Sequence, residues 1–276
     1  MPNEPNFDGP NPDQYADWFR DLTLMDIDGG AAERLYDLIT PALQKSFEDS
    51  PIWQQLLSNL DRWNNHFLAT HDGYRLFQQP LAPVIGVKRY ERALNKAYRW
   101  NVRENPQWPR PPLAPLAPAE FHRDDPNLWY GPHNWSVHFH DIVRTRLTVT
   151  YLDGVKFLAD WIAELATNLG VPADTAMIAD SDGYHAVHIR IPHTFESINF
   201  ESRDPETVIG KVEIQVTTVI KESINDILHS IYESSRLDGL PEGWQWEPEK
   251  APFVNYLGHA VHHLEGTIVT ARKRVS

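Results

Sequence analysis

Cysteine is absent from the 276-residue sequence, and no apolar run approaches the length of a membrane span. Without cysteine there is no disulfide framework and no zinc site built on thiolates. A membrane-spanning helix needs roughly 18 consecutive apolar residues. The start of the chain is polar and rich in proline and asparagine, and it lacks the basic and apolar segments of a signal peptide. We therefore expect a cytoplasmic location and no membrane partner.

Positive charge is also scarce, because 25 Lys and Arg residues face 38 Asp and Glu residues and leave a net charge of −13. Binding to a polyanion draws on Lys and Arg side chains that release its condensed counterions. A non-specific nucleic-acid-binding protein is therefore disfavoured. The exception is the segment 88–103, where six of sixteen residues are Lys or Arg. This segment predicts a local basic patch on an acidic protein.

The apolar residues that are present predict a packed α+β protein. Hydrophobic residues make up 41% of the chain, including ten Trp, ten Tyr and eleven Phe, which is typical of a globular core. The length fits one medium-sized domain with a helical extension. We expect an N-terminal helical region over residues 1–80 and a second domain over residues 81–276. The second domain would contain a mixed β-sheet flanked by helices.

Helical spacing of apolar residues predicts three helices between Pro12 and Phe77, with breaks at Gly29-Gly30 and Pro51. A fourth helix, about Arg89 to Val102, carries the basic segment. The proline-dense stretch that follows, 106–118, suits neither a helix interior nor a central strand. Two further helices are predicted from about Thr218 to Glu233 and from about Pro252 to Arg272.

Alternation of apolar and polar residues predicts the strands. One runs through Leu147 to Tyr151 and ends at an Asp153-Gly154 turn, after which a helix leads to Gly170. Two more run from about Gly183 to Ile191 and from about Thr207 to Thr217. In the last strand Glu213 and Gln215 share the polar face, which we expect to be open to solvent. Asp141 has the same parity as the apolar Leu147, so that strand must begin late or contain a bulge.

Three short segments lie at or near the predicted strands: 141–146 (DIVRTR), 183–188 (GYHAVH) and 212–218 (VEIQVTT). In this order and spacing they resemble the conserved blocks of the RelA/SpoT alarmone synthetases, which transfer pyrophosphate from ATP to a nucleotide 3′-hydroxyl. The resemblance covers about Val87 to Glu233. The paired threonines 217–218 and the segment 255–259 resemble the toxic small alarmone synthetases. The resemblance therefore implies a nucleotidyltransferase-like sheet in a short form without a hydrolase domain.

The resemblance also implies roles for single residues. Asp141 and Glu213 would bind Mg²⁺, the expected cofactor, and Glu213 would also act as general base, with Gln215 beside it in the catalytic block. Arg146 would stack on the ATP adenine, an arrangement that suits a planar guanidinium. Tyr184 and His188 would bind the acceptor.

A basic segment upstream resembles the family's ATP-binding helix, and its cations are Lys88, Arg89, Arg92, Lys96 and Arg99. Residues 88, 92, 96 and 99 would share one helix face. Four like charges there are mutually unfavourable, which a bound polyanion would explain. The alternative is an ordinary solvated basic face.

Some positions depart from the family pattern. The family usually has Lys where Asp180 stands, often Arg where Thr217 stands, and Arg or Gln where His185 stands.

Three functions remain open. The first is a pyrophosphokinase that makes (p)ppGpp or (p)ppApp from ATP and a GDP, GTP or adenosine nucleotide acceptor, is growth-inhibitory, and has an antitoxin as a further partner. The second is a toxin that pyrophosphorylates the tRNA 3′ end. The third is a degenerate protein that only binds nucleotide.

A histidine group offers a different interpretation. His259, His262 and His263 lie at i, i+3 and i+4 on the predicted C-terminal helix. This spacing would suit a metal site, but it also describes a polar helix face, and short motifs of this kind are not specific.

Overall fold

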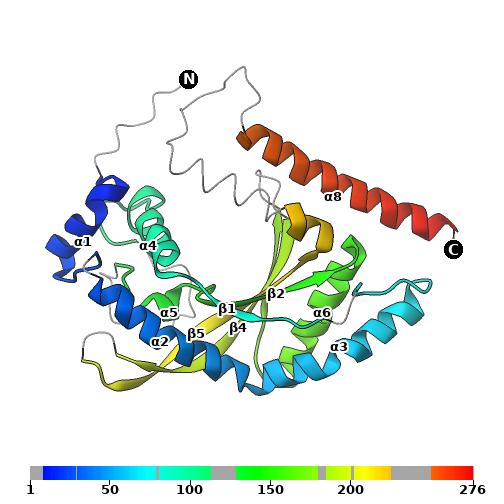
Figure 1. Cartoon of the computed structure of the whole chain (residues 1–276), viewed down its shortest axis with the longest axis horizontal. Helices are drawn as coiled ribbons and strands as arrows, with labels where there is room; N and C mark the ends of the chain where they lie inside the picture. Colours follow the sequence, from blue (N-terminus) through cyan, green and yellow to red (C-terminus); the bar gives the residue numbers. More distant parts are fainter. Residues whose placement is uncertain are drawn as a thin grey trace. The chain divides into compact units, whose positions relative to one another are not determined.

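The computed structural model describes residues 9–28, 30–78, 81–112, 129–179, 185–199, 202–224 and 250–275. Helices and strands follow the chain as shown in Figure 1: α1 (Tyr15–Thr23), α2 (Ala31–Glu48), α3 (Pro51–Thr70), β1 (Ile85–Val87), α4 (Tyr90–Tyr98), α5 (Trp135–His138), β2 (Val143–Val149), α6 (Leu152–Asn168), β3 (Asp174–Ala179), β4 (His185–Ile198), β5 (Pro205–Thr218) and α8 (Lys250–Val275). A π-helical turn (Arg99–Arg103) extends α4.

The strands form one five-stranded sheet in the order β1-β2-β5-β4-β3. β3 pairs antiparallel with β4, in a register that sets Asp174 opposite Arg190 and Ala179 opposite His185. A mixed sheet with flanking helices confirms the predicted α+β class. No helix of the described residues is long and apolar enough to cross a membrane.

The chain divides into two compact units, one of residues 1–49, 86–144 and 192–212, and the other of residues 50–85, 145–191 and 213–276. The boundaries fall inside β1, β2, β4 and β5, so each of these strands contributes a segment to both units. We call them the first and second units and describe each by itself.

The first unit is built around aromatic side chains. Tyr15 and Phe19 of α1 are almost fully buried and pack with Tyr98 and Val102. Tyr36 of α2 meets Tyr90 of α4 at a ring distance of 5.6 Å. Gly30 begins α2 with φ of +59°, a conformation that glycine adopts without strain. The predicted break between the first two helices is therefore confirmed.

The backbones of α5 and β5 lie so close together that only glycine fits at position 210. A Cβ atom on Gly210 of β5 would lie 2.1 Å from the backbone oxygen of Ser136 in α5. No side chain fits there, because carbon and oxygen atoms that are not bonded stay more than 3 Å apart. Glycine at 210 thus lets α5 lie directly on this strand.

In the second unit, α3 packs against α6. Phe67 of α3 and Phe157 of α6 meet edge to face at 5.0 Å. Ser50 caps α3, since its hydroxyl accepts a hydrogen bond from the Trp53 amide. Pro51 occupies the first turn, which confirms the predicted break at that residue.

The structure differs from the predicted strands at Asp153-Gly154 and in the two strands that were not predicted, β1 and β3, and it confirms that β2 starts after Asp141. Tyr151 precedes α6, and Asp153-Gly154 lie inside its first turn instead of forming a turn of their own; an acidic residue is favoured there by the helix dipole. β2 begins only at Val143, which is the late start that the parity of Asp141 required. β3 was not predicted, because its residues are mostly exposed and carry no clear apolar alternation.

Candidate functional site

In the first unit, the carboxylate of Asp141 is held by two lysines. Asp141 lies just before β2, Lys88 follows β1, and Lys96 belongs to α4. The Lys88 amide donates a hydrogen bond to the Ile142 carbonyl at 2.8 Å, which brings the end of β1 beside the start of β2. Lys88 Nζ pairs with Asp141 Oδ2, and Lys96 Nζ lies 2.7 Å from Oδ1. Both carboxylate oxygens therefore have an ammonium partner.

Burial and charge act against each other in this group. The side chains of Lys88 and Asp141 are only 10% and 13% exposed. Burial alone would raise the pKa of Asp141, but the charges and hydrogen bonds of Lys96 and Lys88 outweigh it and hold the pKa below its ordinary value. Burial lowers the pKa of Lys88, and the Asp141 charge opposes this shift. The pairing thus stabilises an ionised carboxylate in a poorly solvated place.

Aromatic rings and a tyrosine complete the surroundings of the lysines. Lys96 Nζ lies 4.6 Å from the Trp100 ring centre and 5.0 Å from that of Phe139, within the range of cation–π attraction. The Tyr36 hydroxyl donates a hydrogen bond to the Lys88 carbonyl at 2.7 Å. These contacts fix both the backbone and the side chains around Asp141.

The predicted basic face of the helix is partly wrong. α4 begins at Tyr90, so Lys88 and Arg89 precede it. Lys88 and Lys96 turn to Asp141, whereas Arg99 pairs with the exposed Glu104 at 2.7 Å. Arg89 is exposed and Arg92 is half-buried. For Lys88, Lys96 and Arg99, acidic residues of the same chain balance the positive charge, so these three cations do not require a bound polyanion.

In the second unit, Glu213 and Gln215 of β5 lie among polar side chains of the neighbouring strands. Gln215 Nε2 donates to Glu213 Oε1 at 2.8 Å, and His188 Nδ1 of β4 lies 3.2 Å from Glu213 Oε2. Arg190 Nε lies 3.6 Å from the same oxygen. Arg146 Nε of β2 donates to Gln215 Oε1 at 3.2 Å. Four of the predicted site residues, at 146, 188, 213 and 215, thus form one connected group.

Arg146 has a further partner. Its Nη1 pairs with Glu222, in the helical turn that follows β5. The Arg146 side chain remains 37% exposed. Glu222 and Arg190 were missed from the sequence. Their signals were weak, since Arg190 merely shares the parity of His188 and Glu222 merely lies one turn beyond the last strand.

The expectation that the Glu213 face is open to solvent is wrong. Glu213 is 5% exposed and Gln215 is 6% exposed. Residues 212–218 of β5 are all buried, and side chains from β2 and β4 lie against Glu213 and Gln215. Tyr184, the predicted acceptor-stacking residue, lies outside the described residues, as do the segment 225–233 and Asp180.

The described arrangement does not fit a magnesium ion on Asp141, because both carboxylate oxygens accept hydrogen bonds from lysines. Among the described residues no three His, Cys, Asp or Glu side chains are placed to share a metal ion. The histidine group does not converge either. His185 Nε2 lies 3.2 Å from His259 Nδ1, and the His185 ring stacks on that of His262 at 4.1 Å. Parallel stacking points ring nitrogens past one another, so the polar-face interpretation is the better one.

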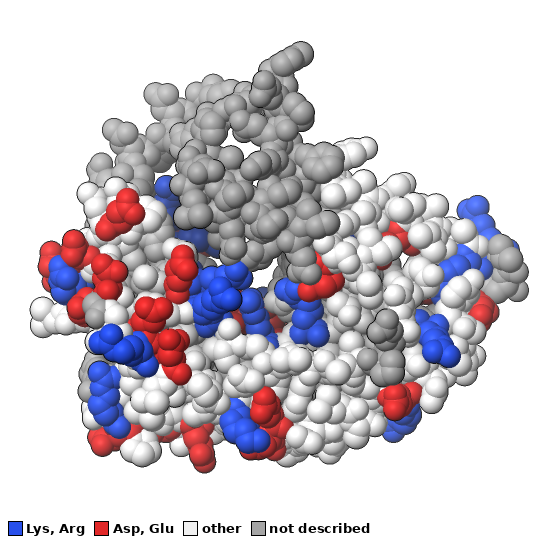
Figure 2. Space-filling view, viewed as in Figure 1, with Lys and Arg blue, Asp and Glu red and all other residues white. Residues whose placement is uncertain are grey.

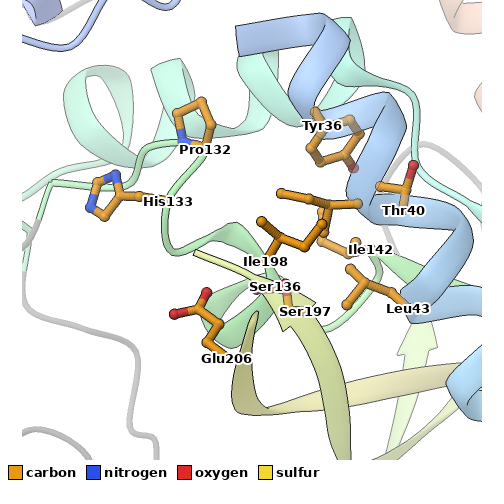
Figure 3. Close-up of a pocket in the computed structure, with 11 residues that line it drawn as sticks. Tyr36, Thr40, Leu43, Pro132, His133, Ser136, Ile142, Ser197, Ile198 and Glu206 are labelled. Carbon is orange, nitrogen blue, oxygen red and sulfur yellow. The ribbon is translucent and has the colours of Figure 1, made fainter. Parts of the chain in front are cut away.

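Two surface features bear on ligand size and charge. A cavity of about 20 Å³ in the first unit is lined by residues that include Tyr36 of α2, Ser136 of α5 and Glu206 of β5 (Figure 3). It has room for about one water molecule, so it is no nucleotide site. On the face shown in Figure 2, basic side chains lie among acidic ones, so the net charge of −13 does not make this face uniformly acidic.

Comparison with solved structures gives the fold. Small alarmone synthetase 1 from Bacillus subtilis, bound to its product pppGpp, matches 84% of this chain and 97% of its own with a TM-score of 0.50 and 17% identity. Small alarmone synthetase 2 from the same organism matches 81% of this chain and 96% of its own, with a TM-score of 0.46 and 15% identity. A GTP pyrophosphokinase family protein from Streptococcus pneumoniae matches 83% of this chain and 95% of its own, with a TM-score of 0.43 and 18% identity. No protein-family model matches the sequence, and no curated protein matches it significantly. The likeness to synthetase 1 shows that this chain has the fold of a small alarmone synthetase.

Proposed function

We propose that this protein is an ATP-dependent pyrophosphokinase that transfers the β,γ-diphosphate of ATP to the 3′-hydroxyl of a purine nucleotide. The observation that carries the proposal is the buried Glu213, held by Gln215 and His188 and connected to Arg146. The fold supports it, since the chain resembles a synthetase whose product is pppGpp. The order of the three sequence blocks supports it independently.

In the reaction, Glu213 would accept the proton of the acceptor 3′-hydroxyl. The oxygen would attack the β-phosphorus of ATP, the bond from the β-phosphorus to the oxygen on the α-phosphate would break, and AMP would leave. Such a transfer depends on positioned cations and on a base near the hydroxyl. Arg146 would stack on adenine, while Gln215 and Glu222 hold its orientation.

Lys88 and Lys96 would serve the triphosphate. Lysine is a common phosphate ligand that acts as a point charge, and here two lysines lie together in the first unit. Arg89, Arg92 and Arg99 remain proposed ATP contacts from the same segment. Asp141 was expected to bind Mg²⁺ together with Glu213, but both of its oxygens are paired with lysines and do not fit the ion, so no Mg²⁺ site is proposed on Asp141. Because the lysines occupy Asp141 as described, no step above depends on the metal.

The proposal for the acceptor rests on Tyr184 and His188. Tyr184 would stack on the acceptor base, and His188 would meet the ribose or phosphate beside Glu213. Guanosine and adenosine nucleotides are both compatible with a stacking tyrosine, because every base presents a π-face.

The test is incubation of pure protein with ATP labelled at the β-phosphate and GDP, GTP, AMP, ADP, ATP or deacylated tRNA in turn. Transfer to a mononucleotide, with one AMP formed for each product, supports the proposal. Transfer to tRNA alone would replace it with the tRNA-modifying toxin. Binding of ATP with no transfer to any acceptor would leave a nucleotide-binding protein, the candidate that the lysine-occupied Asp141 favours.

Growth inhibition is a separate part of the proposal. An active pyrophosphokinase would consume ATP and accumulate its product, so expression should slow growth, and a protein antitoxin would then be needed as a partner. Wild type and Glu213→Gln should be expressed side by side in one host. Equal growth with equal amounts of soluble protein would remove growth inhibition and leave the enzyme.

A further inference from the structure

Arg190 is a charged residue of the second unit that the proposed reaction has not yet used. It lies on β4, two residues after His188 and directly opposite Asp174 of β3. Its guanidinium reaches two carboxylates, with Nη1 3.6 Å from Asp174 Oδ2 and Nε 3.6 Å from Glu213 Oε2. The side chain of Arg190 therefore lies between Asp174 of the edge strand β3 and the proposed general base on β5.

Neither contact is a hydrogen bond. Charge-assisted N–H···O bonds are about 2.7–2.9 Å long, and both distances exceed this range. Arg190 Nε is buried and has no hydrogen-bond partner among the described residues. A guanidinium carries five N–H donors in a rigid plane, and a buried donor without an acceptor is unfavourable. The Nε donor of Arg190 is thus held in place without an acceptor among the described residues.

Glu213 does not depend on Arg190 for its own partners. Gln215 Nε2 and His188 Nδ1 already lie 2.8 and 3.2 Å from its two oxygens. Asp174 is a weak competitor, because its side chain is 55% exposed and solvent-exposed ion pairs contribute little. A ligand group with several oxygen atoms, bound beside Glu213, would accept hydrogen bonds from Arg190 better than either carboxylate does. Phosphate matches the planar fork of arginine in this way.

We propose that Arg190 binds the phosphoryl group being transferred, at the side of Glu213, and stabilises its charge in the transition state. This inference rests on the proposed function, which brings the β-phosphate of ATP and the acceptor hydroxyl together at Glu213. Arg190 would rotate from its loose contacts and donate two parallel hydrogen bonds to phosphoryl oxygens.

The test compares Arg190→Gln, Arg190→Lys and Asp174→Asn with wild type in the labelled-ATP assay. We expect Arg190→Gln to lower kcat by at least a hundredfold with KM for both substrates changed less than fivefold. Arg190→Lys should lower kcat less than Arg190→Gln does, because lysine keeps the positive charge but lacks the planar guanidinium. Asp174→Asn is the matched control, since it removes the cross-strand ion pair and keeps Arg190. It should leave kcat within about threefold, because a pair this exposed contributes little.

Three outcomes are decisive. If Asp174→Asn and Arg190→Gln lose activity equally, Arg190 acts through the ion pair and the proposal is wrong. If Arg190→Gln keeps wild-type kcat, the proposal is also wrong, while the pyrophosphokinase function stands. If wild type transfers to no acceptor, the function fails first, and titration calorimetry with pppGpp decides on Arg190: weaker binding by Arg190→Gln but not by Asp174→Asn would support a phosphate contact, and equal binding would overturn it. Thermal melting of all variants checks that each is folded.

Discussion

Replacing Asp141 by Asn should destabilise the protein, although the two side chains have nearly the same shape. Asp141 balances Lys88 and Lys96, and the side chains of Lys88 and Asp141 are almost buried. Removing one partner of a buried ion pair costs about 3–5 kcal/mol. Since Asn can still accept one hydrogen bond, we expect the lower end of this range. With a urea m-value of about 3 kcal/mol/M, the unfolding midpoint should fall by about 1 M.

The assay is urea unfolding followed by fluorescence and circular dichroism. Asp160→Asn is the control, because Asp160 pairs with Lys156 in a solvent-exposed ion pair, and such pairs contribute only about 0–1 kcal/mol. Equal midpoints for the two variants would refute the view that Asp141 is a buried counterion.

The effect of Asp141 should depend on pH in one direction. Its pKa in the folded chain lies below that of an unfolded aspartate, which is about 3.9. A depressed carboxyl pKa stabilises the fold above the unfolded value and loses this contribution as pH falls toward the folded value. The difference in unfolding free energy between wild type and Asp141→Asn should be constant from pH 5 to 7 and shrink below about pH 4. A difference that grows on acidification would contradict the ion-pair geometry.

Two further changes test the packing of each unit. Gly210→Ala should lower the melting temperature by several degrees, because its Cβ would overlap the Ser136 carbonyl, whereas at Gly86 the nearest atom would be 3.9 Å away and alanine should have little effect on melting. Arg272→Ala should speed hydrogen exchange in α8, since the Arg272 guanidinium lies 3.6 Å from the Tyr74 ring centre. Lys273→Ala is the control, because Lys273 is exposed. Equal exchange in the two variants would show that the contact of Arg272 with Tyr74 does not hold α8.

The helices could be predicted from the sequence because their cause is local. The apolar spacing of α2 and α3 and the break at Pro51 depend on residues a few positions apart. The edge strand β3 could not be predicted, because Met177 is 76% exposed and the strand depends on its pairing with β4. Propensity does not reveal such a partner.

The candidate site shows the same limit. The residue types at 141 and 213 were found through the order of the blocks. The partners of Asp141, however, are separated from it by 45 and 53 positions, and a charge run in a sequence does not show which acidic residue will meet it. The burial of Glu213 was missed for a related reason. Strand parity gives the face of a side chain but not the side chains of neighbouring strands that cover it.

The most direct test of the central claim is labelled-ATP transfer by wild type and Glu213→Gln, measured on protein of matched purity and with melting curves for both. Gln is nearly isosteric with Glu but cannot take the proton of the 3′-hydroxyl. General-base catalysis contributes about 10²–10⁴-fold, so we expect wild type to form AMP and a pyrophosphorylated nucleotide in equal amounts and Glu213→Gln to lose at least a hundredfold. Activity of a folded Glu213→Gln within about tenfold of wild type, a barrier change of only about 1.4 kcal/mol, would contradict the account.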